Sequence, residues 1–415
     1  MQPGGGDKAG AVAEAVARSS YGKLVAFLAA RTRDVAAAED ALADAFAAAL
    51  SDWPATGVPD QPEAWLMTVA RRRLIDAARR RRHAEDSVDH VRLLIAEMEA
   101  AAEANLPDHR LALMFACAHP AIEPAMHAPL MLQTILGFDA ATIASAFLVA
   151  PATMGQRLVR AKAKIREARI PFRIPEPEEL PERLDTVLAA IYAIYAEGWC
   201  DPLGTETRRR NLAEEGIWLG RLVAVLLPDA AEALGLLALM LHAEARRFAR
   251  RNANGDYVPL AEQDPALWEA ALIDEAEGLL HRASGLGVIG RYQLEAAVQS
   301  AHVVRRQTGR ADWAAIERLY DALAVMTGSP VVAVNRAIAI AETRGATAGL
   351  AALDELAADT RLVDYQPYWA ARAELLARAG DPAADIAYQR AIGLESDPAV
   401  RRFLQDRWEA LFAKA

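Results

Sequence analysis

The sequence predicts an all-α protein in which two small helical domains precede a large domain of helical repeats. Three observations lead to this prediction. Ala, Leu, Arg and Glu dominate the composition, and no long alternating run of β-branched residues occurs. Apolar residues recur at helical spacing through most of the chain. From about residue 311 the helical patterns come in pairs, which is typical of stacked repeat proteins.

The chain has 415 residues, which is long enough for two or three domains, and its net charge of −10 is unevenly distributed. Residues 1–170 carry 20 Lys and Arg against 20 Asp and Glu, whereas residues 171–415 carry 26 against 36. Within the neutral part, residues 65–82 hold seven Arg and one Asp, and residues 152–169 hold six basic residues and one Glu. This segregation indicates two basic helices for a polyanion and an acidic surface for another partner.

The N-terminus does not resemble a signal peptide, because no apolar segment follows a basic start. The longest apolar stretch, residues 222–241, is interrupted by Pro228 and two acidic residues, so it reads as two buried helices. Cys117 and Cys200 are the two cysteines, which fits a reducing compartment. We therefore expect a cytoplasmic protein without a membrane-spanning segment.

Residues 1–13 are Gly-rich and are predicted to be disordered. Two helices are expected between residue 14 and Trp53, and the second begins near Asp34. One face of this second helix is acidic, and its apolar face includes Phe46. The acidic positions are Glu39, Asp40 and Asp44. Residues 54–62 contain three prolines and Gly57, which predicts a loop.

A strongly basic helix is predicted at residues 62–83, with Trp65 and other apolar side chains facing inward. Its basic positions are Arg71, Arg72, Arg73, Arg79, Arg80, Arg81 and Arg82. They cannot all pair with Asp76. A surface this basic, beside Trp65 and a Pro-rich loop, suits phosphates and unstacked bases. The alternative is a solvated helix end.

Residues 136–169 contain two helical patterns separated by a tight break. Asp139 is placed to cap the first helix, and Pro151 suits the first position of the second. The apolar stripe of the second helix consists of Met154, Leu158, Ala161 and Ile165. Its opposite face carries Thr153, Gln156, Arg157, Arg160, Lys162, Lys164, Arg166 and Arg169. This pattern fits a helix-turn-helix domain whose second helix enters the DNA major groove, or a helical hairpin with a solvated basic face.

Several of these runs resemble extracytoplasmic-function (ECF) sigma factors. D-x-x-x-A-E-D-A-x-x-D-A-F at 34–46 and P-x-A-W-L-x-x-V-A-R at 62–71 resemble sigma region 2, and T-M-x-Q-R-L-x-R-A-K at 153–162 is similar to sigma region 4. C-A-H-P at 117–120 resembles a subgroup that carries a tetratricopeptide-like C-terminal extension. The resemblance implies a region 2 domain at 14–83, a linker at 84–107, a region 4 helix-turn-helix domain at 108–170, a Pro-rich connector at 171–182 and a helical extension at 183–415.

The resemblance also implies partners and sites. The partners would be core RNA polymerase and promoter DNA. The −35 element would be read by Thr153, Gln156, Arg157, Arg160, Lys162 and Lys164. The −10 element would be opened and read by Trp65, Arg71, Arg72, Arg73, Arg79 and Arg80. Core polymerase would be bound by Glu39, Asp40, Asp44 and Phe46.

No Gly-rich phosphate loop, catalytic triad or zinc-ligand spacing is found in the sequence. Cys117 lies inside an apolar run, and His119 and His127 stand among prolines. We interpret them as a small buried Cys and turn histidines rather than as metal ligands. The sequence therefore predicts neither an enzyme nor a cofactor or metal site, since polymerase would perform the chemistry.

The extension shows strong apolar periodicity, and the segment directly after the stiff connector is expected to pack on the 108–170 domain. The periodic segments are 183–197, 212–227, 230–248, 267–283 and 290–304. Asn252 to Asp256 should form a turn, and Asp264-Pro265 should start the helix that carries Trp268. Residues 367–394 fit the tetratricopeptide pattern, with a weaker copy at 331–357. Such pairs form concave surfaces for a protein or peptide partner, or pack without one.

The leading interpretation is a sigma factor regulated by its fused helical extension, which could either activate or inhibit it. One alternative is a one-component helix-turn-helix regulator with a helical-repeat sensor domain. Another is a helical-repeat interaction scaffold whose basic helices bind a generic polyanion. The acidic helix at 34–46 favours the sigma factor, since only that class needs a polymerase-docking face beside a strand-opening loop.

Overall fold

The computed structural model describes residues 5–82, 108–147, 149–199 and 207–412. In these ranges every regular element is a helix, apart from one antiparallel bridge between Arg251 and Tyr257, so the all-α prediction is confirmed. The described residues up to Gly216 form one compact unit, and those from Ile217 onward form a second. The division falls within α10 (Thr207–Leu226), later than the Pro-rich connector at 171–182 where the sequence suggested it.

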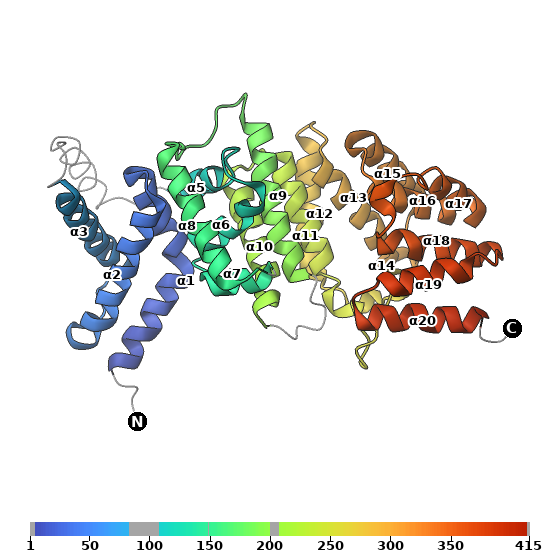
Figure 1. Cartoon of the computed structure of the whole chain (residues 1–415), viewed down its shortest axis with the longest axis horizontal. Helices are drawn as coiled ribbons and strands as arrows, with labels where there is room; N and C mark the ends of the chain where they lie inside the picture. The colour runs from blue at the N-terminus through green and yellow to red at the C-terminus, as the bar shows by residue number, and fades with distance from the viewer. Residues whose placement is uncertain (1–4, 83–107, 148, 200–206, 413–415) are drawn as a thin grey trace. The chain divides into compact units, whose positions relative to one another are not determined.

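The first unit opens with three helices that pack together, α1 (Gly5–Thr32), α2 (Val35–Thr56) and α3 (Pro62–Arg82) (Figure 1). Helix α1 begins at Gly5, so the disorder expected up to residue 13 is wrong from there on. The reason is that Ala9 and Ala13 are buried and extend the apolar side of the helix. The loop expected at 54–62 is also shorter, because α2 continues through Pro54 to Thr56 with Trp53 buried in its last turn.

Five further helices complete most of the first unit (Figure 1). They are α5 (Arg110–Cys117), α6 (His127–Thr134), α7 (Ala140–Ala146), α8 (Pro151–Glu167) and α9 (Leu180–Trp199), with a 3-10 turn, η1 (Pro124–Met126), between α5 and α6. The Asp139 carboxylate accepts the Thr142 N–H at 2.8 Å and so caps α7, and Pro151 is the first residue of α8. Both predictions are confirmed. The linker predicted at 84–107 lies outside the described residues.

The α1–α3 helices and the α5–α8 helices share one core rather than forming two separate domains. Gly22 of α1 lies against the turn after α6, where a Cβ would collide with the carbonyl oxygen of Ile135. Gly137, in the same turn, has φ +74°, and a Cβ there would lie 3.2 Å from the Tyr21 ring. Such close backbone approach requires glycine. The two parts that resemble separate sigma domains therefore pack as one body.

Helix α9 packs on α5 and α6, as the periodicity at 183–197 predicted. Its buried side includes Leu184, Leu188 and Ile191. Arg183 Nη2 donates a hydrogen bond of 2.7 Å to the carbonyl oxygen of Phe115, in the last turn of α5. The segment after the connector is therefore part of the first unit's core.

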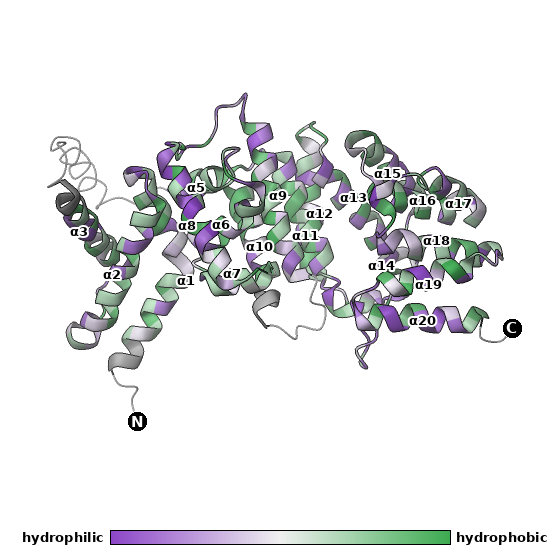
Figure 2. Ribbon diagram, viewed as in Figure 1, coloured by the Kyte–Doolittle hydropathy of each residue, from purple (hydrophilic) through white to green (hydrophobic). Residues whose placement is uncertain are grey.

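The second unit is built around α11 (Ala231–Glu244), which is buried along almost its whole length and is largely hydrophobic in Figure 2. It packs against α12 (Ala270–Gly285) and α13 (Arg291–Val303). The Glu232 carboxylate accepts the backbone N–H groups of Tyr292 at 2.9 Å and Gln293 at 3.0 Å, which satisfies the first turn of α13. A Cβ on Gly235 would stand 2.6 Å from the Gln293 nitrogen, so α11 and α13 approach closely there.

The segment between α11 and α12 is largely irregular, with three short 3-10 turns. These are η2 (Arg247–Arg250), η3 (Leu260–Glu262) and η4 (Pro265–Leu267). The turn at Asn252 is confirmed, because its Oδ1 accepts two backbone N–H groups at 2.9 Å. The prediction that a helix starting at Asp264-Pro265 carries Trp268 is wrong. Asp264 caps only η4, and Trp268 stays outside α12 because its side chain is buried against Ala245 and Ile273.

The remaining helices follow one another in packed pairs (Figure 1). They are α14 (Arg305–Thr308), α15 (Trp313–Thr327), α16 (Pro330–Arg344), α17 (Ala346–Asp354), η5 (Thr360–Leu362), α18 (Gln366–Ala379), α19 (Ala384–Leu394) and α20 (Pro398–Phe412). The pair predicted at 367–394 is α18 and α19, joined at Gly380 with φ +72°. In the weaker copy, a Cβ on Gly349 would lie 2.8 Å from the Ala337 carbonyl oxygen, so α16 and α17 touch there. That these helix pairs are related to tetratricopeptide repeats stays a prediction. Among the described residues, no helix is both long and apolar enough to cross a membrane.

Candidate nucleic-acid and polymerase interfaces

Helix α8 divides its cationic side chains between two faces. Its predicted apolar stripe is buried in full: Met154, Leu158, Ala161 and Ile165. On one side of this stripe, Arg157, Arg160 and Lys164 are exposed and line a concavity of about 410 Å³. Its wall includes the apolar side chains of Ile122 and Met126. Thr153 and Gln156 are exposed as well. Five of the six residues expected to read DNA therefore lie on the open surface of α8.

The sixth, Lys162, faces α2 instead. Its Nζ lies 2.6 Å from Glu39 Oε2, and the two side chains are only 12% and 11% exposed. One turn further along α8, Arg166 lies 3.5 Å from Asp34, the cap of α2. Burial raises the pKa of Glu39, although the Lys162 ammonium opposes this shift. A residue expected to bind DNA and a residue expected to bind polymerase are thus paired with each other.

Apart from Glu39, the acidic positions of α2 are open to solvent. Asp40 and Asp44 are exposed, as expected for a docking face, and Phe46 is half-buried. Asp44 lies 3.8 Å from Arg73 of α3, and both side chains are more than half exposed. A pair so exposed contributes little to stability, so it leaves both charges available to partners.

Helix α3 presents Arg72 and Arg73 to solvent, but it holds Trp65 and Arg71 partly inside. The Trp65 ring stands edge-on to Trp53 at 5.4 Å. The Arg71 guanidinium lies 5.5 Å from the centre of the Phe27 ring. Burial, together with the nearby positive charge of Arg31, lowers its pKa. Arg79 and Arg80 belong to α3, but their side chains are not among those that the structure describes.

Cys117, the last residue of α5, and His127, the first residue of α6, are both buried. Cys117 is fully buried, and its Sγ lies 3.4 Å from Thr134 Oγ1. Burial raises the pKa of this thiol to about 12, so it stays protonated. The Nε2 atom of buried His127 is 3.1 Å from the Ile122 carbonyl oxygen. The interpretation of Cys117 as a small buried side chain is confirmed. Within the described part of the chain, no group of three or more His, Cys, Asp and Glu side chains is arranged to hold a metal.

Sequence reasoning missed the contact between α2 and α8. Glu39 and Lys162 are 123 positions apart, and each belongs to a helix face that reads as solvated. One signal was present: Lys162 stands directly beside Ala161 of the buried stripe. Such a position at the edge of a helix's apolar face often contacts a neighbouring element.

Comparison with known proteins finds two matched regions and a relative that aligns along most of the chain. Residues 16–84, which cover most of α1 and all of α2 and α3, match sigma-70 region 2. Residues 183–284 match a family of unknown function, DUF6596. An uncharacterized protein of Rhizobium meliloti (strain 1021) is 36% identical over 390 residues, which covers 92% of each chain. No solved structure matches the chain. The chain therefore belongs to one family with the R. meliloti protein along nearly its whole length, and its residues 16–84 are similar to sigma-70 region 2.

Proposed function

We propose that the chain is a sigma factor of the ECF class, which directs core RNA polymerase to specific promoters and performs no catalysis itself. The match to sigma-70 region 2 implies binding to core RNA polymerase and to promoter DNA. The finer assignment to the ECF class is supported by the motifs at 34–46, 62–71 and 153–162. The proposed setting is the cytoplasm.

The −35 element is proposed to be read by the exposed face of α8. The observation that carries this proposal is the cluster of Arg157, Arg160 and Lys164 around one concavity, beside a short helix in helix-turn-helix order. Spacings of three and four residues place these cations on one side of the helix, where phosphates and base edges of a major groove can meet them. Thr153 and Gln156 extend the same face toward the N-terminus of α8.

Helices α2 and α3 are proposed to serve polymerase and the −10 element. Asp40 and Asp44, with Phe46 beside them, form the docking face for core polymerase. Arg72 and Arg73 contact the phosphates near the melted strands, and the edge of Trp65 offers a surface for an unstacked base. Lys162 and Glu39 take up their roles only when α8 leaves α2, because they neutralise each other while the helices are in contact.

The test is co-purification with core RNA polymerase followed by run-off transcription from a dependent promoter. Changing Arg157→Ala together with Arg160→Ala should weaken binding to the −35 element, since each lost base or phosphate contact costs about 1–3 kcal/mol. The double variant Arg401→Ala and Arg402→Ala, on α20, removes the same charge far along the sequence and should transcribe normally. Unchanged transcription by the α8 variant would show that this helix does not read the promoter.

The C-terminal extension is proposed to regulate the sigma function as a positive element. Its helix pairs are proposed to bind a protein or peptide partner in the manner of tetratricopeptide repeats. The packing of α9 on α5 and α6 supports a positive role, because the extension begins inside the body that carries α8.

A further inference from the structure

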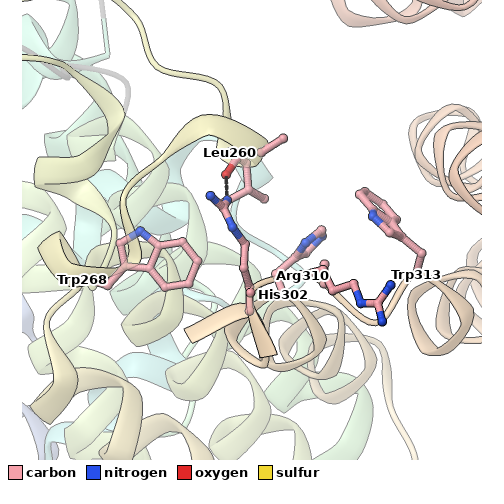
Figure 3. Close-up of a pocket in the computed structure, with 9 residues that line it drawn as sticks. Leu260, Trp268, His302, Arg310 and Trp313 are labelled. Atoms are coloured by element: carbon pink, nitrogen blue, oxygen red, sulfur yellow. Dashed lines mark hydrogen bonds between the residues drawn. The ribbon is translucent and has the colours of Figure 1, made fainter. Parts of the chain in front are cut away.

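A cavity in the second unit lies between the irregular segment after α11 and the helices α13 to α15 (Figure 3). Its volume is about 230 Å³. This is somewhat smaller than the pockets that hold drug-sized ligands, so it suits a molecule of one or two rings. Figure 3 shows Trp313 on one side of the cavity and Trp268 and Leu260 on the other.

The wall of the cavity is fixed in place by side chains. The Arg305 guanidinium donates one hydrogen bond to the Leu260 carbonyl oxygen at 2.7 Å and another to that of Gln263 at 2.8 Å. Trp268 is 4% exposed and packs on Ile273. The irregular segment is therefore anchored against α14 and α12. Long irregular connections inside compact domains are uncommon and are usually functional.

The charge around the cavity favours an anion. None of its lining residues is acidic, whereas two are arginines. Arg305 is already committed to backbone carbonyl groups, but the Arg310 guanidinium has no ion pair within the described residues and is exposed. It lies at the rim, on the same side of the cavity as Trp313 (Figure 3). A guanidinium in this position can take a carboxylate through two parallel hydrogen bonds.

The other residues that line the cavity favour a ligand with a flat, apolar ring. His302 stands edge-on to Trp313, with 5.3 Å between the ring centres. Burial, reinforced by the positive charges of Arg246 and Arg305, lowers the pKa of His302 to about 4, so the ring is neutral at pH 7. A neutral imidazole next to an indole adds one donor and one acceptor to an aromatic wall. The indole N–H of Trp268 has no hydrogen-bond partner among the described residues, although it is buried.

From these features we infer that the cavity binds a small planar aromatic carboxylate. The ring of the ligand lies between Trp313 and the wall of Leu260 and Trp268, and its carboxylate pairs with Arg310. Ring stacking on an indole and a charge-assisted pair are both specific interactions, and neither is available to a neutral aliphatic molecule.

The experiment titrates the full chain calorimetrically with benzoate and with indole-3-acetate. Benzamide, the neutral counterpart of benzoate, and benzylamine, its cationic counterpart, are the matched ligands. Saturable binding is expected for the carboxylates, and affinity at least about tenfold lower is expected for benzamide and benzylamine because the charge-assisted pair is lost. Circular dichroism of each variant confirms that it is folded.

Two substitutions locate the binding. Arg310→Gln should lower the affinity for benzoate at least about tenfold. Arg306→Gln, on α14 but outside the cavity lining, should retain the affinity of the unmodified chain. The inference is overturned if neither carboxylate binds saturably in the millimolar range, if benzamide binds as well as benzoate, or if Arg310→Gln leaves the affinity unchanged. Because the readout is binding alone, its failure would leave the proposed sigma function untouched.

Discussion

At the scale of single residues, the pair formed by Lys162 and Glu39 has the clearest consequence. Both side chains are nearly buried, so removing one partner leaves a charge without compensation. Lys162→Met should therefore lower the free energy of unfolding by about 3 kcal/mol, as is typical of a broken buried ion pair. Urea unfolding followed by circular dichroism measures this change.

Two further variants serve as controls for the stability measurement on Lys162→Met. Lys164→Met removes the same charge from the exposed face of α8 and should leave stability within about 0.5 kcal/mol of the original. The double variant Glu39→Gln with Lys162→Met removes both charges and should recover most of the loss. Equal destabilisation by Lys162→Met and Lys164→Met would mean that the buried pair is not formed in solution.

Glu39 also predicts a pH dependence. Burial raises its pKa in the folded chain above the ordinary value of 4.5, so the folded chain keeps this proton to a higher pH than the unfolded chain does. The stability contributed by this bound proton is complete below the unfolded pKa and is lost as the pH rises through the folded pKa, because ionised Glu39 bears a cost of burial that Lys162 only partly offsets. Relative to Glu39→Gln, the unmodified chain should therefore lose unfolding free energy as the pH rises above 4.5. Parallel curves for the two proteins would contradict this.

At the scale of helices, α2 makes a prediction that separates docking from folding. Asp40 and Asp44 are exposed, so Asp40→Lys with Asp44→Lys should leave the fold intact. Loss of charge complementarity should reduce capture by core RNA polymerase about tenfold in a pull-down. Asp52→Lys with Asp60→Lys reverses two other exposed carboxylates and serves as the control. Equal recovery of both variants would remove α2 from the polymerase interface.

Helices could be predicted from the sequence where the spacing of apolar residues marks one face as buried. The stripe of α8 from Met154 to Ile165 is buried as the spacing predicted, and Asp139 and Pro151 mark the helix starts. Trp268 was misplaced because a cap and a proline predict a start without saying how long the helix will be. The predicted helix is only one 3-10 turn long, and Trp268 follows it, buried against Ala245 and Ile273.

Of the candidate site, the open face of α8 and the acids of α2 could be read from charge segregation alone. The pairing of Glu39 with Lys162 could not, since it depends on how α1 meets the turn before α7. That meeting requires Gly22, whose role is a contact with Ile135 more than a hundred residues away. A pattern within one helix carries no information on such a contact.

At the scale of the whole chain, the position of α9 predicts how truncations behave. A fragment that ends at residue 175 lacks α9 and exposes the sides of α5 and α6 that this helix covers. A fragment that ends at Gly216 keeps the first unit intact. The shorter fragment should therefore melt at a lower temperature, because the buried side of α9, including Leu184, Leu188 and Ile191, is lost.

Run-off transcription with the same fragments distinguishes the roles of the extension. The 1–175 fragment should show greatly reduced promoter-directed transcription compared with the full chain. The 1–216 fragment reports on the second unit alone, since the core around α8 is complete in it. If either fragment transcribes more than the full chain, the extension inhibits rather than assists.

The division of α8 into a paired face and an open face makes the protein respond unevenly to ionic strength. Arg157, Arg160 and Lys164 stand in water, so dissolved salt screens them and competes for the phosphates they would bind. Lys162 and Glu39 are shielded from the same ions by the helices around them. If α8 binds DNA as proposed, a rise in salt weakens that contact while leaving the ion pair between Lys162 and Glu39 nearly unchanged. The balance between the two contacts shifts toward α2 as the surroundings become more concentrated.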